Sequence, residues 1–343
     1  MITPTCLIEV NPADGSIIQP FDFMHNVSIN SSWENLIDTC TLVLPKKVKV
    51  RKTGRYLDPI TSGNNVIFRR GDGITVNLGY DGNLTRRFQG VISHVNPKVP
   101  VQLLCEDDGF RLKQSICPKY FQESGTLSNI LKTILPIDVR TGKQYVFHCD
   151  DIRLGKFTIE KCSVMELLDY LKKHFGFSIY FRDNILFVGL AYTQQKIADF
   201  SNPDTPLNVF HFQKNIISTN NLEFFREEDI KYKVTSVSWQ PDNSKKIFNF
   251  GDVDGELRTL NFYGLSDADV KKLSIDWLGR FKYTGFRGSF TAFLDPIVQH
   301  GDAIVLRDAI IPDRNGTYLV KKVVTESGVN GGRQTITLDR ILI

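Results

Sequence analysis

Three groups of acidic residues have the best spacing in this sequence for acid–base chemistry: Asp107-Asp108, Asp150-Asp151 and Glu227-Glu228-Asp229. Paired carboxylates could cleave a glycosidic bond if two of them faced each other across a cleft, one as general acid and the other as base or nucleophile. Acidic pairs beside expected strands are more often solvated turns. We therefore expect exposed turns here, with a glycan-cleaving pair as the alternative.

The other motifs of catalysis and metal binding are missing from the sequence, which has no Gly-x-Ser-x-Gly elbow, His-Glu-x-x-His helix or Walker loop. The glycines at 328–332 stand between two expected strands, which indicates a hairpin turn rather than a phosphate cradle. Six cysteines lack Cys-x-x-Cys spacing, so we expect free thiols made in a reducing compartment, and His148 beside Cys149 is too isolated for zinc. The sequence thus predicts no catalytic, cofactor-binding or metal-binding residues, no small-molecule substrate and no enzymatic activity.

A run of basic residues is the group that we expect to bind a partner. Its members are Lys46, Lys47, Lys49, Arg51, Lys52 and Arg55. Their mutual repulsion favours a projecting loop. A nucleic-acid site would need interleaved aromatic rings, and only Tyr56 is close. We expect an acidic protein neighbour, and a solvated loop without a partner is the alternative.

Length and composition are those of a folded protein with more than one domain. A chain of 343 residues is long enough for two or three cores. The 41% hydrophobic residues argue against disorder, and the 24 phenylalanines favour β-rich packing. A net charge of +4 is too small for a dedicated nucleic-acid binder. We expect no secretion signal and no membrane span, since the sequence has no basic and apolar leader and no run of about 18 apolar residues.

Two stretches of the sequence resemble each other, and the predicted fold is organised around them. The first contains Gly71-Asp72 and apolar segments at 73–78, 88–95 and 101–107. The second contains Gly301-Asp302 and apolar segments at 303–306, 317–323 and 335–339. Alternation of apolar and polar residues predicts half-buried strands, and the Asp-Gly and Asn-Gly pairs predict turns. We interpret each stretch as a three-stranded meander, and chance similarity of two unrelated meanders is the alternative.

The remaining elements divide the chain into three regions. Strands at 6–10, 24–29 and 38–44 complete a small first β-barrel over residues 1–110. Residues 111–200 form an α+β module with helices at 127–134 and 164–175 and a hairpin at 177–189. The second helix has a capping box of Ser163 and Glu166 and an expected C-cap at Gly176.

The third region, residues 201–343, contains further strands, a capped helix at about 266–279 and the second Gly-Asp stretch. Its strands are expected at 207–212, 221–225 and 232–239, and segments at 245–250 and 257–262 extend the β region. The predicted fold class is therefore mainly β with an α+β insert, in which two similar small β-barrels flank the module.

In this order, the pieces resemble the baseplate hub proteins of contractile phage tails. That superfamily includes the phage late control protein D group, the hubs of Mu-like phages and the N-terminal part of type VI secretion spike proteins. The segments that carry the resemblance are Gly71-Asp72 with 88–92, 163–189, 266–277, 285–290, 300–302 and 315–318. Its structural motif residues are Gly71, Asp72, Gly90, Gly301, Asp302, Gly316 and Tyr318.

The resemblance implies a structural subunit of the virion, in the tail baseplate, made in the bacterial host cytoplasm. Each subunit would contribute two similar barrels, so that a homotrimer presents a ring of near-sixfold symmetry. Such a ring would join the hexameric tail tube to a trimeric spike and would contact other baseplate proteins. The spike is expected to be a separate polypeptide, since the chain ends after its last strand. DNA would pass through the channel at most non-specifically.

Two other functions remain open at this point. The acidic pairs and the three tryptophans would suit a tail component that binds or degrades the cell wall. A hub domain from a long noncontractile tail would share the same fold. The related injection devices derived from phages are a further possibility, and the host is not indicated by the residues.

Overall fold

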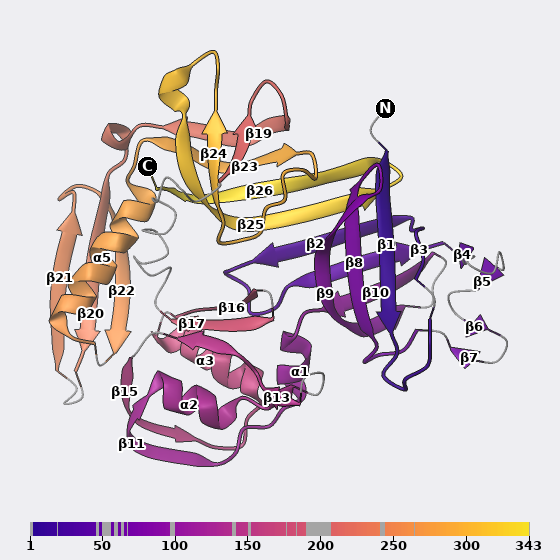
Figure 1. Cartoon of the computed structure of the whole chain (residues 1–343). Helices are drawn as coiled ribbons and strands as arrows, with labels where there is room; N and C mark the ends of the chain where they lie inside the picture. Colours follow the sequence, from indigo (N-terminus) through magenta and orange to yellow (C-terminus); the bar gives the residue numbers. More distant parts are fainter. Residues whose placement is uncertain are drawn as a thin grey trace.

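The protein is mainly β, with an α+β module between two groups of strands that we call the first and second barrels (Figure 1). The computed structural model describes residues 3–18, 20–45, 48–49, 56–57, 61–62, 65–66, 68–96, 100–138, 142–149, 152–175, 177–182, 184–189, 207–240, 244–263 and 265–342. Within these ranges, no helix has both the length and the apolar character needed to cross a membrane.

The first barrel follows the alternation of its sequence. Its strands are β1 (Pro4–Asn11), β2 (Asn26–Ser32), β3 (Thr39–Leu44), β8 (Gly73–Tyr80), β9 (Asn83–Asn96) and β10 (Val101–Glu106), in the order β1-β8-β9-β10-β3-β2. In β3, for example, Cys40, Leu42 and Leu44 are buried and alternate with less buried residues. The strands predicted at 6–10, 24–29 and 38–44 are confirmed. Between β3 and β8 lie the short strands β4 (Val48–Lys49), β5 (Tyr56–Leu57), β6 (Thr61–Ser62) and β7 (Asn65–Val66).

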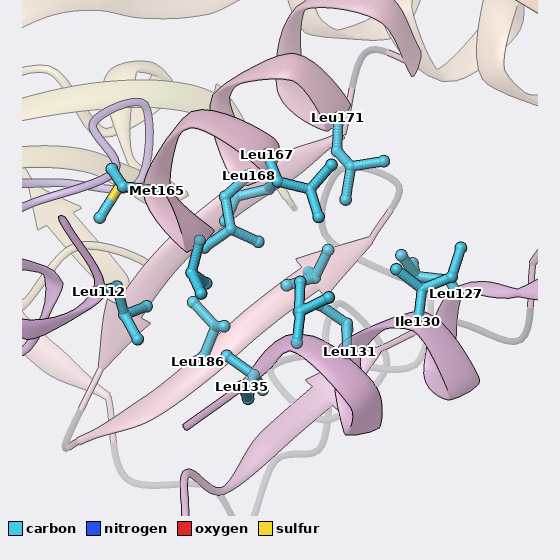
Figure 2. Packing of buried hydrophobic residues seen from close by; sticks show 14 of the residues in the cluster. Leu112, Leu127, Ile130, Leu131, Leu135, Met165, Leu167, Leu168, Leu171 and Leu186 are labelled. Atoms are coloured by element: carbon cyan, nitrogen blue, oxygen red, sulfur yellow. The ribbon is translucent and has the colours of Figure 1, made fainter. Parts of the chain in front are cut away.

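The α+β module packs helices against a small sheet. Its elements are α1 (Gly109–Gln114), β11 (Tyr120–Thr126), α2 (Leu127–Ile134), β12 (Ile137–Asp138), β13 (Lys143–Gln144), β14 (Phe147–Cys149), β15 (Arg153–Ile159), α3 (Val164–Phe175), β16 (Ser178–Arg182) and β17 (Ile185–Gly189). Figure 2 shows the leucines of α2 and α3 meeting Leu112 and Leu186 in a shared apolar core. Burying such side chains contributes about 1.5–3 kcal/mol each.

Both helices predicted for the module are confirmed. The N-terminus of α3 is closed by the predicted capping box, in which the Ser163 N–H donates to Glu166 Oε2 at 2.7 Å and the Glu166 N–H donates to Ser163 Oγ at 3.2 Å. The Thr126 hydroxyl caps α2 by accepting the Asn129 N–H at 3.3 Å. The C-cap expected at Gly176 lies outside the described residues.

The second barrel pairs directly with the first. Its strands are β18 (Asn208–His211), β19 (Ile216–Phe225), β23 (Gly285–Ala292), β24 (Ala303–Arg307), β25 (Gly316–Gly328) and β26 (Gly331–Ile341), with the short helix η2 (Pro312–Arg314). Strand β25 pairs with β24 and β26 and, over its later residues, with β2 in a register from Asn26↔Gly328 to Ser32↔Lys322. The two barrels therefore share one 12-stranded sheet.

The strands at 232–263 lie apart from the 12-stranded sheet. Strands β20 (Tyr232–Trp239), β21 (Lys245–Gly251) and β22 (Glu256–Tyr263) form a separate three-stranded sheet, preceded by η1 (Glu227–Asp229). Helix α5 (Asp267–Phe281) covers one face of this sheet, and Ser274 and Ser236 share a hydrogen bond there at 2.6 Å. Strand periodicity does not reveal which strands pair. Here β20 is the central strand, antiparallel to β21 on one side and parallel to β22 on the other.

Helix α5 also ends later than predicted. It continues through Gly279 to Phe281. Nothing lies within 4 Å of a Cβ built at Gly279, and the ring of Phe281 packs against Trp277 at 4.4 Å between centroids. The apolar contact of the last turn therefore extends the helix beyond the glycine.

Candidate functional site: the paired Gly-Asp motifs and the module junction

The first Gly-Asp motif is a tight turn that leads into β8. Gly71 has a φ of 100°, a conformation that favours glycine. The Asp72 N–H donates to the Arg69 carbonyl at 3.2 Å, and Asp72 Oδ2 accepts the Arg69 N–H at 2.8 Å. The aspartate thus closes the turn with both its backbone and its side chain.

The second Gly-Asp motif has the same geometry at the start of β24. Gly301 has a φ of 82°. The Asp302 N–H donates to the Gln299 carbonyl at 3.2 Å, and Asp302 Oδ2 accepts the Gln299 N–H at 2.8 Å. Both hydrogen bonds that close the first turn therefore have counterparts in the second.

The two turns are also bound to the following strand in the same way. The Gly71 N–H donates to Ile92 O at 2.9 Å, and the Ile92 N–H donates to Asp72 O at 2.8 Å. In the second motif the Gly301 N–H donates to Val320 O at 2.7 Å, and the Val320 N–H donates to Asp302 O at 2.8 Å. We call the β8–β10 meander with its turn the first copy, and β24–β26 with its turn the second copy.

The strand registers of the two copies coincide residue by residue. Ile74 faces Gly90 in the first copy, and Ile304 faces Tyr318 in the second. Gly90 and Tyr318, two of the motif residues named from the sequence, therefore occupy equivalent positions. Two unrelated meanders would not be expected to share turn, hydrogen bonds and register.

The equivalent positions Gly90 and Tyr318 have different surroundings. A Cβ at Gly90 would lie 2.2 Å from the Glu106 carbonyl oxygen, so the close approach of β9 and β10 requires glycine. The Tyr318 side chain is fully buried, and its hydroxyl accepts the Phe286 N–H at 2.9 Å. Its ring fills the space that side chains at Gly285 and Gly316 would occupy. The glycine at 316 is thus explained by the tyrosine that follows it.

The second oxygen of each motif aspartate contacts a different part of the protein. Asp72 Oδ1 accepts the Ala13 N–H at 3.0 Å, which holds the segment after β1. Asp302 Oδ1 accepts from the guanidinium of Arg182, at the end of β16 in the α+β module. Arg182 and Asp302 are about three-quarters buried, with exposed fractions of 25% and 23%. The second copy is therefore tied to the module by an ion pair.

Two carboxyl groups lie at the same junction: Asp107, which is buried, and Asp38, whose side chain is 18% exposed. Asp38 accepts from Ser31 Oγ and from the Ser32 N–H, and Asp107 Oδ2 accepts the Asp38 N–H at 2.8 Å. Burial raises the pKa of Asp38 to about 7, and the hydrogen bonds from the two serines partly oppose that rise. Burial, and then the charge of Asp38, raise the pKa of Asp107. His300 Nε2 lies 3.7 Å from Asp38 Oδ2, on the side of the second barrel.

A small hollow of about 100 Å³ opens beside these groups. It is lined by all three parts of the chain, including Phe88 from the first barrel, Phe181 from the module and Val298 from the second barrel. Ligand pockets generally measure about 300–1,000 Å³, so this one is too small for a sugar ring with its neighbours. The arrangement can exchange protons, but it offers no cleft between two carboxylates.

The three acidic groups named from the sequence lie in different surroundings. Asp107 and Asp108 are buried, which corrects our expectation of a solvated turn, because the Gly109 N–H and the Asp38 N–H bind the Asp107 carboxylate inside the junction. Residues 227–229 are exposed in η1, as expected. Asp150 and Asp151 lie outside the described residues.

The predicted basic contact residues fall mostly outside the part of the chain that the structure describes. Lys46, Lys47, Arg51, Lys52 and Arg55 lie outside it, and only the backbone of Lys49 is described, in β4. None of the six cysteines forms a disulfide in the structure. Among the described residues, no group of three or more His, Cys, Asp or Glu side chains is placed to hold a metal ion.

Comparison with known proteins reveals the fold class. Neither a family model nor a curated protein matches the sequence. A tail protein from Neisseria meningitidis MC58 matches with a TM-score of 0.62 and 15% identity, over 98% of this chain and 96% of its own. The 43 kDa tail protein of prophage MuSo2 from Shewanella oneidensis matches with a TM-score of 0.59 and 14% identity, over 98% and 97%. An Escherichia coli component of the type VI secretion system matches with a TM-score of 0.57 and 9% identity, over 97% and 76%.

The chain therefore has the fold of phage tail proteins and of a type VI secretion component. This confirms, at the level of fold, the resemblance that the order of motifs indicated. It also confirms the fold class of a mainly β protein with an α+β insert.

Sequence reasoning missed Asp38, Arg182 and His300 as members of the junction. Arg182 had a weak signal, since it is the first residue of the turn expected after an aromatic strand. Asp38 and His300 are 262 positions apart in the sequence. His300 precedes the Gly301-Asp302 motif and Asp38 begins an expected strand, but no local pattern places the two side by side. Their contact arises only when the barrels meet.

Proposed function

We propose that this protein is a baseplate hub subunit of a phage tail or of a related contractile injection system. Three chains would form a ring that joins the hexameric tail tube to a trimeric spike. The observation that carries this proposal is the pair of copies with the same turn, hydrogen bonds and register in a single chain.

The internal duplication supports a change of symmetry. A homotrimer of a chain with two equivalent copies presents six similar units around one axis, which matches a sixfold partner on one side and a threefold partner on the other. Such a ring is a closed head-to-tail assembly, in which the same contact repeats until the rotation closes. A chain with one copy would need six subunits and would lose the threefold match.

The proposed partners follow from that role. They are two further copies of the chain, a tail tube protein, a separate spike protein and other baseplate proteins, all within the virion. We further propose that the basic run from Lys46 to Arg55 contacts an acidic protein neighbour. DNA would pass through the ring without sequence-specific contacts.

We propose that the role is structural rather than enzymatic. Asp38 and the buried Asp107 are the best placed acid–base pair among the described residues, and they line a hollow of about 100 Å³. A wall-degrading function would need room for a glycan between two accessible carboxylates. Peptidoglycan zymography tests this directly, and a band of clearing that Asp38→Asn removes would contradict the structural role.

Native mass spectrometry and cryo-electron microscopy of the full chain test the ring. We expect a species with three times the mass of one chain, alone or with the tube and spike proteins encoded beside it, and images with threefold symmetry and six similar lobes. A chain that remains monomeric with those partners, or that forms a ring of six chains, would contradict the proposal. The genes beside it would also distinguish a contractile from a noncontractile tail.

A further inference from the structure

The connection between the first two strands differs between the copies. In the first copy β8 and β9 are joined by a tight turn, with Asp81 at a φ of 51° and Gly82 at 86°. In the second copy, β24 and β25 are joined by a longer loop, residues 308–315, which contains η2. Figure 1 shows this loop projecting beyond the tip of β24. The shared fold does not require the extra residues, because the first copy closes without them.

This loop is held firmly by its first residue. Asp308 is buried, and its Oδ1 accepts the Ile310 N–H at 2.9 Å, the Ile311 N–H at 3.2 Å and Gln213 Nε2 at 2.9 Å. The Asp308 N–H donates to Asn315 Oδ1 at 2.7 Å, which joins the two ends of the loop. These contacts order the backbone before any partner arrives.

The ordered loop presents apolar side chains to solvent. Ile310 is 76% exposed and Ile311 is 38% exposed. Single exposed apolar residues are common, but here two adjacent isoleucines stand on a loop whose backbone bonds are already satisfied. We call the side chains of Ile310 and Ile311 the knob. Because a preordered loop loses little conformational entropy on binding, the knob is suited to fill a hollow in another protein.

A hollow with an apolar lining, which would suit the two isoleucines, lies at the opposite end of β25. It has a volume of about 480 Å³ and is lined by apolar groups that include Cys6, Phe23, Leu84 and Val329. Phe23 is 50% exposed and Val329 is 74% exposed, so the rim is apolar as well. Gly82 of the tight β8–β9 turn forms part of its wall. The hollow thus lies at the place in the first copy that corresponds to the loop of the second copy.

The knob cannot reach the hollow of its own chain. The loop precedes Gly316 at the start of β25, and the hollow is lined by Ser327 and Gly328 at its end. A strand of this length separates them by roughly 40 Å at about 3.3 Å per residue. The two surfaces can meet only between different molecules.

We propose that Ile310 and Ile311 of one copy of the chain insert into the hollow beside β1 and the β8–β9 turn of the next copy. This inference rests on the proposed ring and names one of its contacts. Because knob and hollow are different surfaces, the contact is head-to-tail, the type that closes rings by rotation. It places the second copy of one chain beside the first copy of its neighbour, as a ring of alternating copies requires.

Charges at the two surfaces fit this orientation. Arg307, at the base of the loop, and Asp22, at the wall of the hollow, are both exposed and opposite in sign. Asp313 on the loop is also exposed, so we assign the affinity to the isoleucines and only the orientation to the ion pair.

Cross-linking between two differently labelled variants tests the contact. Ile310→Cys and Phe23→Cys chains are mixed and treated with a short bismaleimide, and linked peptides are identified by mass spectrometry, which separates introduced from native thiols. We expect a link between positions 310 and 23 of different chains at least about tenfold more abundant than in a control mixture of Val253→Cys and Phe23→Cys. Val253 is 89% exposed on the β21–β22 turn, far from the second copy in the chain.

A second measurement separates this contact from the ring itself. Ile310→Asp should weaken self-association at least about tenfold in native mass spectrometry, whereas Val253→Asp should leave it unchanged, with both variants melting like the wild type. Trimers that form equally well with Ile310→Asp, or without the 310–23 link, would overturn this contact and leave the proposed ring standing. A wild-type chain that neither associates nor cross-links would overturn both.

Discussion

The two Gly-Asp copies are alike in their backbone and different wherever they touch the rest of the protein. Their turns, cross-strand hydrogen bonds and register coincide. They differ in the residue opposite the first strand, Gly90 or Tyr318, and in the partner of the aspartate, Ala13 or Arg182. The comparison teaches that the common unit is defined by its backbone, while each copy carries side chains for its own surroundings.

The ends of the third strands show the same division. The first copy is followed by Asp107, which is buried next to Asp38. Near the end of the second copy, Asp339 is close to Arg280, with 3.8 Å between Arg280 Nε and Asp339 Oδ2. Burial raises the pKa of Asp339, and Arg280 and Arg340 counteract that rise. The carboxyl group after the first copy, Asp107, therefore lies beside a second carboxyl group, Asp38. The carboxyl group near the end of the second copy, Asp339, instead has cationic neighbours.

The largest effect on stability is expected from replacing Gly90, a glycine that the first copy needs and the second copy does not. Gly90→Ala places a Cβ 2.2 Å from the Glu106 carbonyl oxygen, which belongs to the backbone and cannot rotate away. We expect the free energy of unfolding to fall by about 3 kcal/mol or more, measured by urea unfolding. Gly279→Ala is the control, because its Cβ has free space in a helix and should stabilise the protein by up to about 1 kcal/mol. Equal stabilities of the two variants would remove the steric argument for Gly90.

A pH-dependent stability is the next effect, and it should arise at the carboxyl pair beside the end of the first copy, Asp107 with Asp38. The folded pKa of Asp38, about 7, lies above that of an exposed aspartate, so folding favours its protonated form. This contribution is therefore complete below about pH 4 and is lost as the pH rises through about 7, with a slope of at most about 1.4 kcal/mol per pH unit for one proton. Asp107 acts in the same direction.

Asp38→Asn should flatten this profile in melting curves taken from pH 5 to 8. The exposed Glu227 supplies the control, since Glu227→Gln should leave the wild-type profile unchanged. If Asp38→Asn keeps the full loss of stability between pH 6 and 8, the titrating group lies elsewhere.

The ion pair of the second copy should produce a smaller, local effect. In a double-mutant cycle, Arg182→Met and Asp302→Asn should show a coupling of about 1 kcal/mol, because the pair is partly buried. The same arginine substitution combined with Asp72→Asn should be additive within about 0.5 kcal/mol, since Asp72 binds the Ala13 N–H instead. Equal coupling in both cycles would mean that the aspartates do not differ in their partners.

The smallest effect on folding is expected from the basic run, which precedes the first copy alone. The corresponding residues before the second copy, 276–285, contain only the basic residues Arg280 and Lys282. Reversal of Lys46, Lys47, Arg51 and Lys52 to glutamate should leave the melting temperature unchanged and reduce incorporation into particles. Reversal of the exposed Lys119 and Lys132 serves as the control. Normal incorporation of the first variant would mean that the run is a solvated loop.

Much of the fold could be predicted because its signals are local. The helix at 164–175 was marked by Ser163 and Glu166, three positions apart, and these residues form the capping box in the structure. Alternating residues such as Cys40, Leu42 and Leu44 marked a strand with one buried face. The pairing of strands carries no such signal, so the sequence did not reveal that β20, β21 and β22 form a sheet of their own.

The junction could be predicted only in part. Asp302 belonged to a recognisable motif, and its turn matched that of Asp72. The burial of Asp38 depends on His300 and on the second barrel, which lie far away along the sequence. No local pattern distinguishes a carboxylate that will be covered by a distant domain from one that will stay in water.

The pairing of β2 with β25 has a consequence for how the chain is made. Ser32 Oγ donates to the Lys321 carbonyl across 289 positions of sequence, so the early strand meets its neighbour only near the end of translation. At about 5–20 residues per second, the delay is on the order of 15–60 s. During that time one edge of β2 has no partner strand, and an unpaired edge is a site of aggregation. Nascent chains halted before β25 should therefore need a chaperone to stay in solution, even though every strand of the first barrel has already been synthesised.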